Sequence, residues 1–560
     1  MWSVVQYRRI GKHVEREWQN QSHQQGSSSS NRDSTVLDVE AGPGLRTVDS
    51  QDTREEPATE RPTDPTMRNL EKHGHAESEH DGGVENGRKK VVVRLRGDAD
   101  PLDPRNWSLA ARAKNIAILS FLIFSQGWAS GADSMANTRM SAAYGVSKVA
   151  ANLSQAMYLF GIGSGCLFCG PLSETVGRNP VYLGCTFCYL CFVLGCAFTS
   201  NLGGRIVCRY FGGLFASAAL GINGASVGDQ FRPVKRAFVF PIIAWANVAA
   251  PMLAPVAGGW LVQDPRRSWH WPDWVTLAIS SAAFVVALLF LPETYLPVLL
   301  DWRARHLRRV AAADSSPYTY VSEHAGKAPL ARRLRDTLAM PAVYFKTEPV
   351  VAVLGSYLVL VYILLFSFLS GFDYIFQRTY GLSDGRTGSC FASIAAGSTA
   401  FTLLSAPALF RWSRAKTHHV RQAPVKPEYR LWPAIVTSPL LPVSLFWLGW
   451  TNYASVSIWA GLAACFGFGV VATALYVSSY EYIVDSYTEH SAVALASITM
   501  ARYLIAGTMV VAARPMYEGI GVHWTMTLLG CLALPLTPAP LLLKWYGEKL
   551  RAKSPLAQSP

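Results

Sequence analysis

Four charged residues in or beside long apolar stretches of this sequence have side chains that could move or balance charge. Arg209 lies within the apolar stretch 203–225, which is long enough to cross a membrane as a helix. A cation at membrane depth is costly unless it meets a partner or a cavity, so Arg209 is a candidate functional residue. The alternative is that its guanidinium extends to the membrane surface. Glu174 and Arg178 lie four residues apart in a polar turn, where they can pair with each other or with helix ends. Asp229 ends the same helix as Arg209.

Two acids and two tyrosines are candidates for the lining of a cavity. Asp373 and Asp133 lie near the ends of apolar stretches, where a carboxylate could bind a cationic group or a proton, or simply face water. Tyr357 and Tyr362 could line a cavity for flat, lipophilic molecules, or serve as ordinary packing residues.

Composition identifies the broad class. Of 560 residues, 50% are hydrophobic and 16% are charged, whereas a soluble protein carries about 25% charged residues. The net charge of +13 comes from Lys and Arg in loops between apolar spans, which topology explains better than a nucleic-acid partner. Cysteines within the spans act as small hydrophobes, and their C-x-x-C spacings lack the further His or Cys set that a zinc site needs.

Sequence motifs also bear on the energy source. There is no G-x-x-x-x-G-K-[ST] phosphate-binding sequence, so the chain lacks the loop that binds the phosphates of ATP in many ATP-driven proteins. We also find no nucleophile–base set. The chain is therefore expected not to be an enzyme and to need no cofactor, with a proton gradient as its energy source.

The apolar periodicity predicts an all-α integral membrane protein with twelve transmembrane helices. The polar segment 293–348 divides them six and six, as expected of two pseudo-symmetric bundles with a site between them. The predicted spans are 115–135, 151–171, 179–199, 203–225, 237–262, 272–292, 349–371, 386–408, 431–450, 455–478, 491–513 and 522–544. The predicted domains are a disordered N-terminal tail (1–100), an N-terminal bundle (101–292), a central cytoplasmic loop (293–348), a C-terminal bundle (349–545) and a C-terminal tail (546–560).

Basic residues predict the orientation. With both termini in the cytoplasm, the inside loops carry most of the Lys and Arg. The outside loops then hold only Arg139, Lys148, Arg205, Arg266, Arg267, Arg378, Arg386 and Arg514. This distribution predicts a multi-pass protein of the cell membrane. Residues 1–18 could form a weakly amphipathic helix on the membrane surface.

Several motifs resemble one family in the expected order. Residues 170–180, GPLSETVGRNP, resemble the G-x-L-x-D-x-x-G-R loop between spans 2 and 3 of the major facilitator superfamily, with Glu in place of Asp. Residues 100–108, DPLDPRNWS, and 291–297, LPETYLP, resemble segments of fungal drug:proton antiporters, as does PEYRLWP at 427–433. The resemblance covers about 100 to 550, and its relatives include multidrug, polyamine and secondary-metabolite exporters.

The resemblance implies roles for individual residues. Arg209 matches the arginine of the span 4 motif, which is associated with proton coupling. Asp229 is expected to join Glu174 and Arg178 in a charge cluster that latches the cytoplasmic side. Arg502 keeps the position of a family arginine in span 11, and we count it with the cavity candidates.

Span 5 departs from the family pattern. Residues 246–259, ANVAAPMLAPVAGG, resemble the antiporter signature G-P-x-x-G-P-x-x-G-G. Both Gly-Pro pairs have become Ala-Pro. Pro251 and Pro255 still remove backbone donors and bend the helix, and Gly258 and Gly259 remain. The substitutions weaken the assignment as an antiporter without removing it.

Three functions compete at this stage. The leading one is proton-coupled export of a small organic molecule, such as a drug, toxin or fungal secondary metabolite, by alternating access. The second is facilitated or proton-coupled uptake of a nutrient or polyamine, and the third is a membrane receptor that transports nothing. The expected partners are a small-molecule substrate, protons and the lipid bilayer, and the protein is expected to be a monomer. The direction of substrate flux separates the three.

Overall fold

The computed structural model describes most of the chain outside the N-terminal tail and the central loop. The described residues are 1–28, 84–85, 88–97, 99–314, 318–322, 332, 340–341, 343–419, 426–487, 491–552 and 554. They form two compact units. Most of the predicted tail, residues 29–83, lies outside the described residues.

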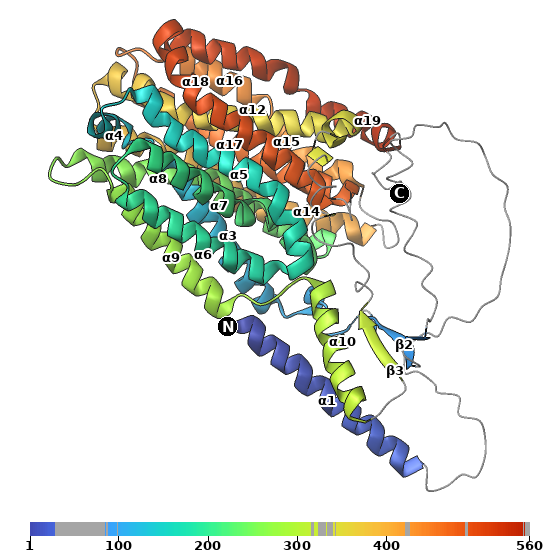
Figure 1. The fold of residues 1–560 in the computed structure, drawn as a ribbon. Helices are drawn as coiled ribbons and strands as arrows, with labels where there is room; N and C mark the ends of the chain where they lie inside the picture. Colours follow the sequence, from blue (N-terminus) through green and yellow to red (C-terminus); the bar gives the residue numbers. More distant parts are fainter. Residues whose placement is uncertain are drawn as a thin grey trace. The chain divides into compact units, whose positions relative to one another are not determined.

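The larger unit, formed by residues 1–2, 107–295 and 328–560, holds both predicted helical bundles. The helix order of Figure 1 places six long helices before the central loop and the remainder after it. The helices of the first bundle are α3 (Leu109–Gly131), α5 (Lys148–Val176), α6 (Arg178–Phe198), α7 (Leu202–Gln230), α8 (Pro233–Gln263) and α9 (Trp271–Phe290), with the short α4 (Asn137–Tyr144) between α3 and α5.

The second bundle is built from helices that are more often interrupted. Its elements are α12 (Pro349–Phe372), η2 (Asp373–Arg378), α13 (Asp384–Cys390), α14 (Ala392–His419), η3 (Pro427–Leu431), α15 (Trp432–Thr437), α16 (Leu440–Trp450), α17 (Ile458–Tyr487), α18 (Ser491–Ala533), η5 (Leu534–Leu536) and α19 (Ala539–Ala552). Gly521 adopts φ 76° and breaks α18 into two helices. The predicted boundary between spans 11 and 12 falls at this break.

Ten segments of the described chain are long and apolar enough to cross a membrane. One of them, Ser491–Ala552, contains both helices of the broken α18. Helix α3 is less apolar because it carries buried polar side chains such as Asn115 and Gln126. Counting α3 and the two halves of α18, the twelve predicted transmembrane helices are confirmed.

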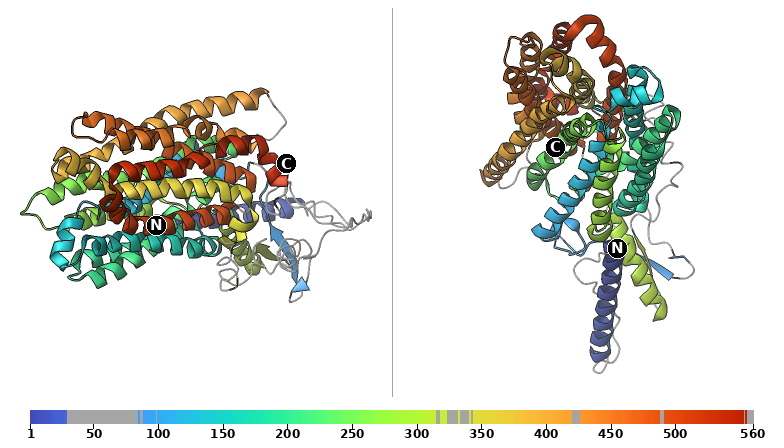
Figure 2. Two further views of the ribbon diagram at one scale, coloured as in Figure 1. Left: turned by 90° about the horizontal axis from the view of Figure 1, so that it is seen from above. Right: turned by 90° about the vertical axis from the view of Figure 1, so that its left-hand side faces the viewer.

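Small residues allow the helices of the larger unit to pack closely, and Figure 2 shows its long helices running side by side. Gly213 of α7 lies directly against the backbone of Tyr158 in α5, so that a Cβ there would clash. Gly469 of α17 lies in the same way against Ile394 of α14. Such contacts are typical of membrane helices, whose association depends on close packing rather than on the hydrophobic effect.

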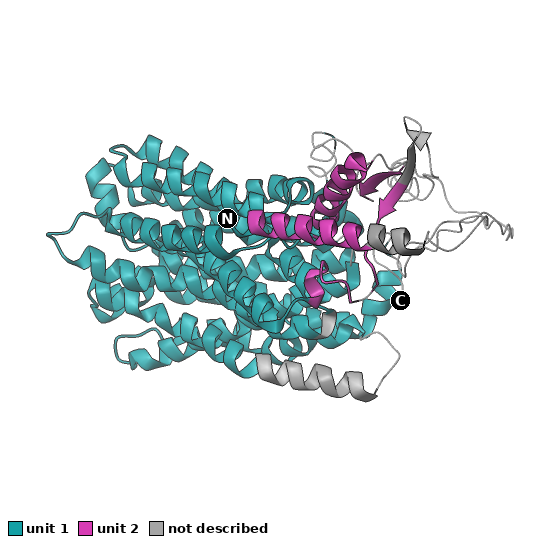
Figure 3. Ribbon diagram, turned by 90° about the horizontal axis from the view of Figure 1, so that it is seen from below, with its two compact units in different colours: residues 1–2, 107–295, 328–560 teal, residues 3–106, 296–327 magenta. Residues whose placement is uncertain are grey.

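The smaller unit combines the start of the chain with the central loop (Figure 3). Its elements are α1 (Trp2–Ser28), β1 (Val84–Glu85), β2 (Arg88–Val93), η1 (Pro104–Asn106), α10 (Leu296–Ala313) and β3 (Tyr318–Ser322). Strand β2 pairs antiparallel with β1 and parallel with β3, and Val93 packs against Leu300 and Ala304 of α10. Within the segment predicted as a tail, α1 contacts α10 and β2 pairs with β3, and these partners lie some 200 to 300 residues later in the chain.

Asp100 organises the lead-in to the first span. Its carboxylate accepts hydrogen bonds from the backbone N–H groups of Arg96 and Leu102 and pairs with Arg303, 3.1 Å away. Burial alone would raise the pKa of Asp100, but these hydrogen bonds and the nearby guanidinium lower it overall. The segment that resembles the antiporter lead-in is thus a folded turn of the smaller unit.

Acidification is expected to loosen α1 from α10. His306 of α10 packs against the ring of Tyr7 at 4.4 Å and against Gly11 of α1. Burial lowers the pKa of His306 below its usual value, so the neutral ring is the form that packs. When α1 is detached from α10, His306 has a higher pKa and binds a proton more readily. The packing of α1 on α10 therefore weakens as the pH falls below about 6.5.

Hydrogen exchange measures this effect. Protection of α1 amides, corrected for the intrinsic rate, should fall between about pH 7.5 and pH 5.5 in the wild type. The His306→Phe variant keeps an aromatic ring that cannot be protonated, so its protection should not change over this range. Equal pH dependence in both proteins would contradict the prediction.

Candidate functional site

A cluster of two arginines and two aspartates lies at one end of the first bundle. Helix α7 begins after Asn201, whose side chain accepts a hydrogen bond from the N–H of Gly204. The cap fixes the start of α7. Arg205 and Arg209 are four residues apart and therefore lie on the same face of this helix, one turn from each other. Asp133 follows the end of α3, and Asp273 lies in the first turn of α9.

The four side chains form one ion-pair network. Arg205 contacts Asp133 at 2.7 Å and Asp273 at 2.8 Å. Arg209 pairs with Asp133 as well, and lies 3.0 Å from Asp273. Each of the four residues is at most 4% exposed. Two cations and two anions give a net charge of zero, which makes the burial of all four tolerable.

Neighbouring groups hold the network in place. Asp133 accepts a hydrogen bond from Ser154 of α5 at 2.8 Å, and Arg209 donates to the carbonyl of Ala129 at 3.0 Å. The indole of Trp269 lies 5.1 Å from the Arg205 guanidinium. His270 follows it, with Nδ1 3.6 Å from the Asp273 carboxylate and 22% of its side chain exposed. His270 therefore connects the buried network to the surface.

A small cavity adjoins the network. It has a volume of about 10 Å³, roughly the space of one water molecule. Arg209, Asp273, Tyr158 and Thr276 are among its lining residues. A proton could reach the carboxylates through a water molecule in this space.

Arginine 205 and Asp273 were not among the predicted site residues. The distribution of basic residues predicts Arg205 in an outside loop, but the structure buries it within α7 at 1% exposure. Its spacing of four residues from Arg209 was a usable signal, because such pairs share a helix face. Asp273 lies one residue inside a predicted span boundary, where an acid looks like an ordinary helix start.

The predicted latch residues lie at the opposite end of the same helices. Arg178 pairs with Asp229 at 3.0 Å and donates to Ser173 at 2.6 Å. Glu174 is a further negative charge that acts on Arg178. The structure therefore brings together the three residues that the resemblance grouped.

The same turn depends on Glu293, which we had treated only as part of a family motif. Its buried carboxylate accepts hydrogen bonds from the N–H groups of Arg178 and Asn179 at the start of α6. Gly177 precedes them with φ 110°, and a Cβ there would lie 2.5 Å from Glu293. Glycine is required at this position for both reasons.

A matching network occupies the same end of the second bundle. Arg430 of η3, just before α15, pairs with Glu481 at 3.2 Å and with Asp485 at 2.9 Å. This repeats the Arg178–Asp229 pair, as pseudo-symmetric bundles should. Asp485 also lies 3.7 Å from Arg236 of α8, so one carboxylate contacts both bundles.

Pro251, Pro255, Gly258 and Gly259, the predicted helix-bend residues, lie in the part of α8 that contacts α3 and α13. Gly131 of α3 contacts the backbone of Pro251. A Cβ on Gly388 of α13 would lie 2.5 Å from the carbonyl of Pro255, and one on Gly259 would lie 2.6 Å from the carbonyl of Asp384. Gly258 of the motif lies near α3, since a Cβ there would be 3.8 Å from Ala132 and Met135.

Polar contacts reinforce this second connection between the bundles. Gln263 accepts a hydrogen bond from the N–H of Gly385, and Trp260 donates to Ser389. The bundles are thus joined at both ends, by α8 and α13 here and by Arg236 and Asp485 at the other.

The predicted cavity residues do not form one site. Asp133 belongs to the ion-pair network, while Asp373 begins the π-helical turn η2 at the end of α12. Tyr362 lies against Arg502, with 4.5 Å between the ring centroid and the guanidinium carbon. Tyr357 is buried in α12. The structure therefore brings together only Arg502 and Tyr362 of this set.

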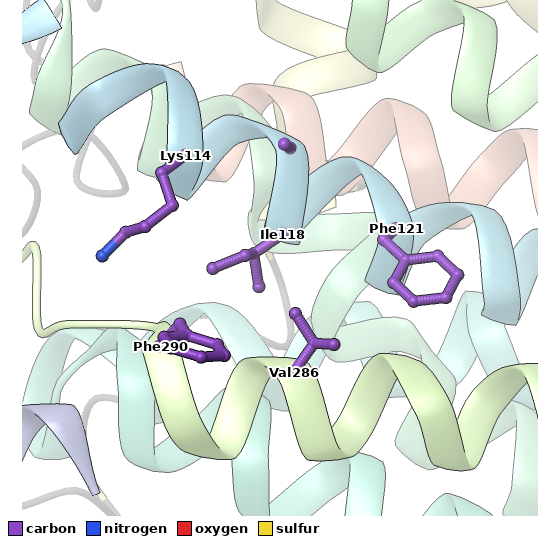
Figure 4. Close-up of a pocket in the computed structure, with 6 residues that line it drawn as sticks. Lys114, Ile118, Phe121, Val286 and Phe290 are labelled. Atoms are coloured by element: carbon purple, nitrogen blue, oxygen red, sulfur yellow. The ribbon is translucent and has the colours of Figure 1, made fainter. Parts of the chain in front are cut away.

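A larger hollow of about 280 Å³ lies between α3 and α9 (Figure 4). Five of its six lining residues are apolar, and the sixth, Lys114, also lies 4.7 Å from the ring of Trp2. None of its lining residues is an acid. The hollow is lined by Lys114, Ala117, Ile118, Phe121, Val286 and Phe290.

Two bundles of six helices with a buried charge network in the first define a membrane transporter fold. The family model of the Major Facilitator Superfamily matches residues 116–510. The chain belongs to this superfamily.

Fungal transporters are among its relatives. The MFS-type transporter kojT of Aspergillus flavus is 36% identical over 471 residues, covering 84% of this chain and 83% of that protein. The citrinin biosynthesis cluster MFS transporter mrr1 of Monascus ruber is 31% identical, covering 83% and 92% of the two chains. The efflux pump FUBT of Fusarium oxysporum is 29% identical, covering 81% and 76%.

Solved structures support the fold. The proton:xylose symporter XylE of E. coli aligns with a TM-score of 0.57 at 13% identity, covering 79% of this chain and 96% of that one. At this identity the likeness shows the fold alone.

Proposed function

We propose that this chain is a proton-coupled exporter of a small organic molecule, working by alternating access. The observation that carries the proposal is the buried, charge-neutral network of Arg205, Arg209, Asp133 and Asp273. The names of two relatives, an efflux pump and a transporter of a biosynthesis cluster, favour export of a metabolite. The excess of basic residues in alternate loops supports cytoplasmic termini.

In this orientation the network lies near the outside, where protons enter. Protonation of Asp133 or Asp273 would leave the buried network with one uncompensated positive charge. Such a charge is costly in a dry site, so the protonated form favours an arrangement in which the network is hydrated or repacked. Proton binding and conformation are coupled in this way, since a ligand shifts an equilibrium by its differential affinity for the two states.

His270 is the proposed entry point. Its side chain is partly exposed, and its Nδ1 atom lies 3.6 Å from the Asp273 carboxylate, so it lies between water and the buried network. The Arg178–Asp229 pair, with Glu174, and the Arg236–Asp485 pair would close the cytoplasmic side while the transporter faces outward.

Flux in proteoliposomes tests the proposal. Purified protein is reconstituted with a pH-sensitive dye inside, and a panel of planar acids, neutral compounds and amines is added in turn. A transported compound should move protons in the opposite direction, and a pH gradient should drive its uphill movement. Co-movement of protons and compound would show uptake instead, and compound flux without proton movement would contradict proton coupling.

A further inference from the structure

Arg502 is a buried cation for which the described residues provide no anionic partner. It lies in the first half of α18 and is 0% exposed. Within the described chain, its Nε, Nη1 and Nη2 atoms form no hydrogen bond. A guanidinium carries five N–H donors, and leaving buried donors unpaired is costly.

Other buried arginines of this protein are paired differently. Arg178, Arg205, Arg209, Arg303, Arg430 and Arg551 each contact at least one carboxylate. No ion pair of Arg502 is present among the described residues. Carboxylates thus neutralise these six buried arginines of the described chain, whereas the guanidinium of Arg502 lies among tyrosine rings.

Four tyrosines surround the Arg502 guanidinium. Its central carbon lies 4.5 Å from the ring centroid of Tyr362, 5.0 Å from Tyr476, 5.6 Å from Tyr480 and 5.1 Å from Tyr503. The rings come from α12, α17 and α18. We call these five residues the tyrosine cage.

Ring faces stabilise the charge but leave the donors unsatisfied. A cation beside an aromatic ring is attracted by the ring quadrupole, which accounts for the burial of the charge. The N–H groups still need acceptor atoms in the plane of the guanidinium. The hydroxyls of Tyr362 and Tyr476 also form no hydrogen bond within the described residues. The unpaired N–H groups of Arg502 and the unpaired hydroxyls of Tyr362 and Tyr476 fit a ligand with oxygen acceptors.

The tyrosine cage lies at the contact between the two bundles. Tyr480 packs against Phe240 of α8, with 6.3 Å between ring centroids. On α18, Leu504 and Met500 lie against Gly163 of α5. Since the bundles separate during alternating access, a ligand could enter the cage when one side opens.

We propose that the tyrosine cage binds the transported substrate, and that this substrate is a planar organic anion. The inference rests on the proposed function. The guanidinium fork receives the two neighbouring oxygens of a carboxylate, as Arg does in bidentate pairs. The tyrosine rings contact the flat body of the molecule.

A matched pair of probes tests this in the wild-type protein. Salicylate is a planar aromatic anion, and salicylamide is its neutral counterpart of nearly the same shape. Titration calorimetry of the full-length protein in detergent should show salicylate binding about tenfold or more tightly than salicylamide, because hydrogen bonds to a charged group are stronger. Equal affinity, or preference for salicylamide, would overturn the proposal.

The Arg502→Met variant separates a binding role from a structural one. Removing an unpaired buried charge should leave the melting temperature of the ligand-free protein unchanged or higher, while salicylate binding is lost. A purely structural arginine would predict a lower melting temperature. Arg502→Lys keeps the charge without the fork and should bind salicylate only weakly. If neither variant folds, the comparison of the two probes on the wild type still decides the question.

Transport distinguishes failure of this inference from failure of the proposed function. Proton-driven export of neutral compounds or amines, with no movement of planar acids, would refute the anionic substrate and leave the exporter intact. Selective salicylate binding without proton-coupled flux of any compound would support the cage and refute the exporter.

Discussion

Replacing Arg209 with alanine is expected to abolish proton-driven transport. The substitution removes one cation from a network of two arginines and two aspartates, leaving Asp133 and Asp273 to share Arg205. The remaining network carries one uncompensated negative charge and no longer couples proton binding to conformation, so flux driven by a pH gradient should fall about 100-fold. Arg209→Lys keeps the charge but not the planar fork that reaches both aspartates, and should rescue only weakly.

Controls separate coupling from folding. Arg139 lies at the same end and donates to the carbonyls of Asp264 and Arg267, so Arg139→Ala should keep its flux. The double variant Arg209→Gln with Asp133→Asn restores neutrality, and it should insert correctly yet remain uncoupled. Near-normal proton-driven flux in correctly inserted Arg209→Ala would remove Arg209 from the mechanism.

Replacing Gly388 with leucine is expected to prevent closure between α8 and α13. Its Cβ would lie 2.5 Å from the carbonyl of Pro255 and 3.2 Å from Gly259. Overpacking of this kind costs about 1–3 kcal/mol, which shifts the population of the closed state about 5- to 150-fold. Transport should fall because the cycle cannot complete.

The accessibility of Cys390 to modification reports whether α8 and α13 have closed. It is 6% exposed in the closed arrangement, so a membrane-impermeant maleimide should modify it slowly in the wild type and rapidly in Gly388→Leu. Gly184→Leu serves as the control, because no atom lies within 4 Å of a Cβ at that position of α6. Slow modification of Cys390 in Gly388→Leu would show that the helices can accommodate the side chain.

Apolar periodicity was sufficient to predict the twelve helices and the division at the central loop. These features depend on local length and composition, which a single sequence displays. The folded part of the N-terminal segment could not be found in this way. Helix α1 contacts α10 through Tyr7, Trp302 and His306, and such a long-range pairing leaves no local pattern.

The candidate site was predicted in part. Arg209 was identified by its depth in a span, and Asp133 by its position at the end of another. The pairing of these two residues was not predicted, because it depends on the packing of α3 against α7. Arg502 and Tyr362 were both selected, but that the Arg502 guanidinium forms no hydrogen bond with the described residues is visible only in three dimensions.

The sharing of Asp485 between Arg430 and Arg236 has a consequence for turnover. The contact within the second bundle, at 2.9 Å, is tighter than the contact across the bundles, at 3.7 Å. When the bundles part on this side, Asp485 keeps Arg430 and gives up only the looser partner, so no carboxylate is left without a cation. In the proposed alternating-access cycle, this arrangement keeps the activation barrier for opening low, while the contact between Asp485 and Arg236 still links the bundles before they part.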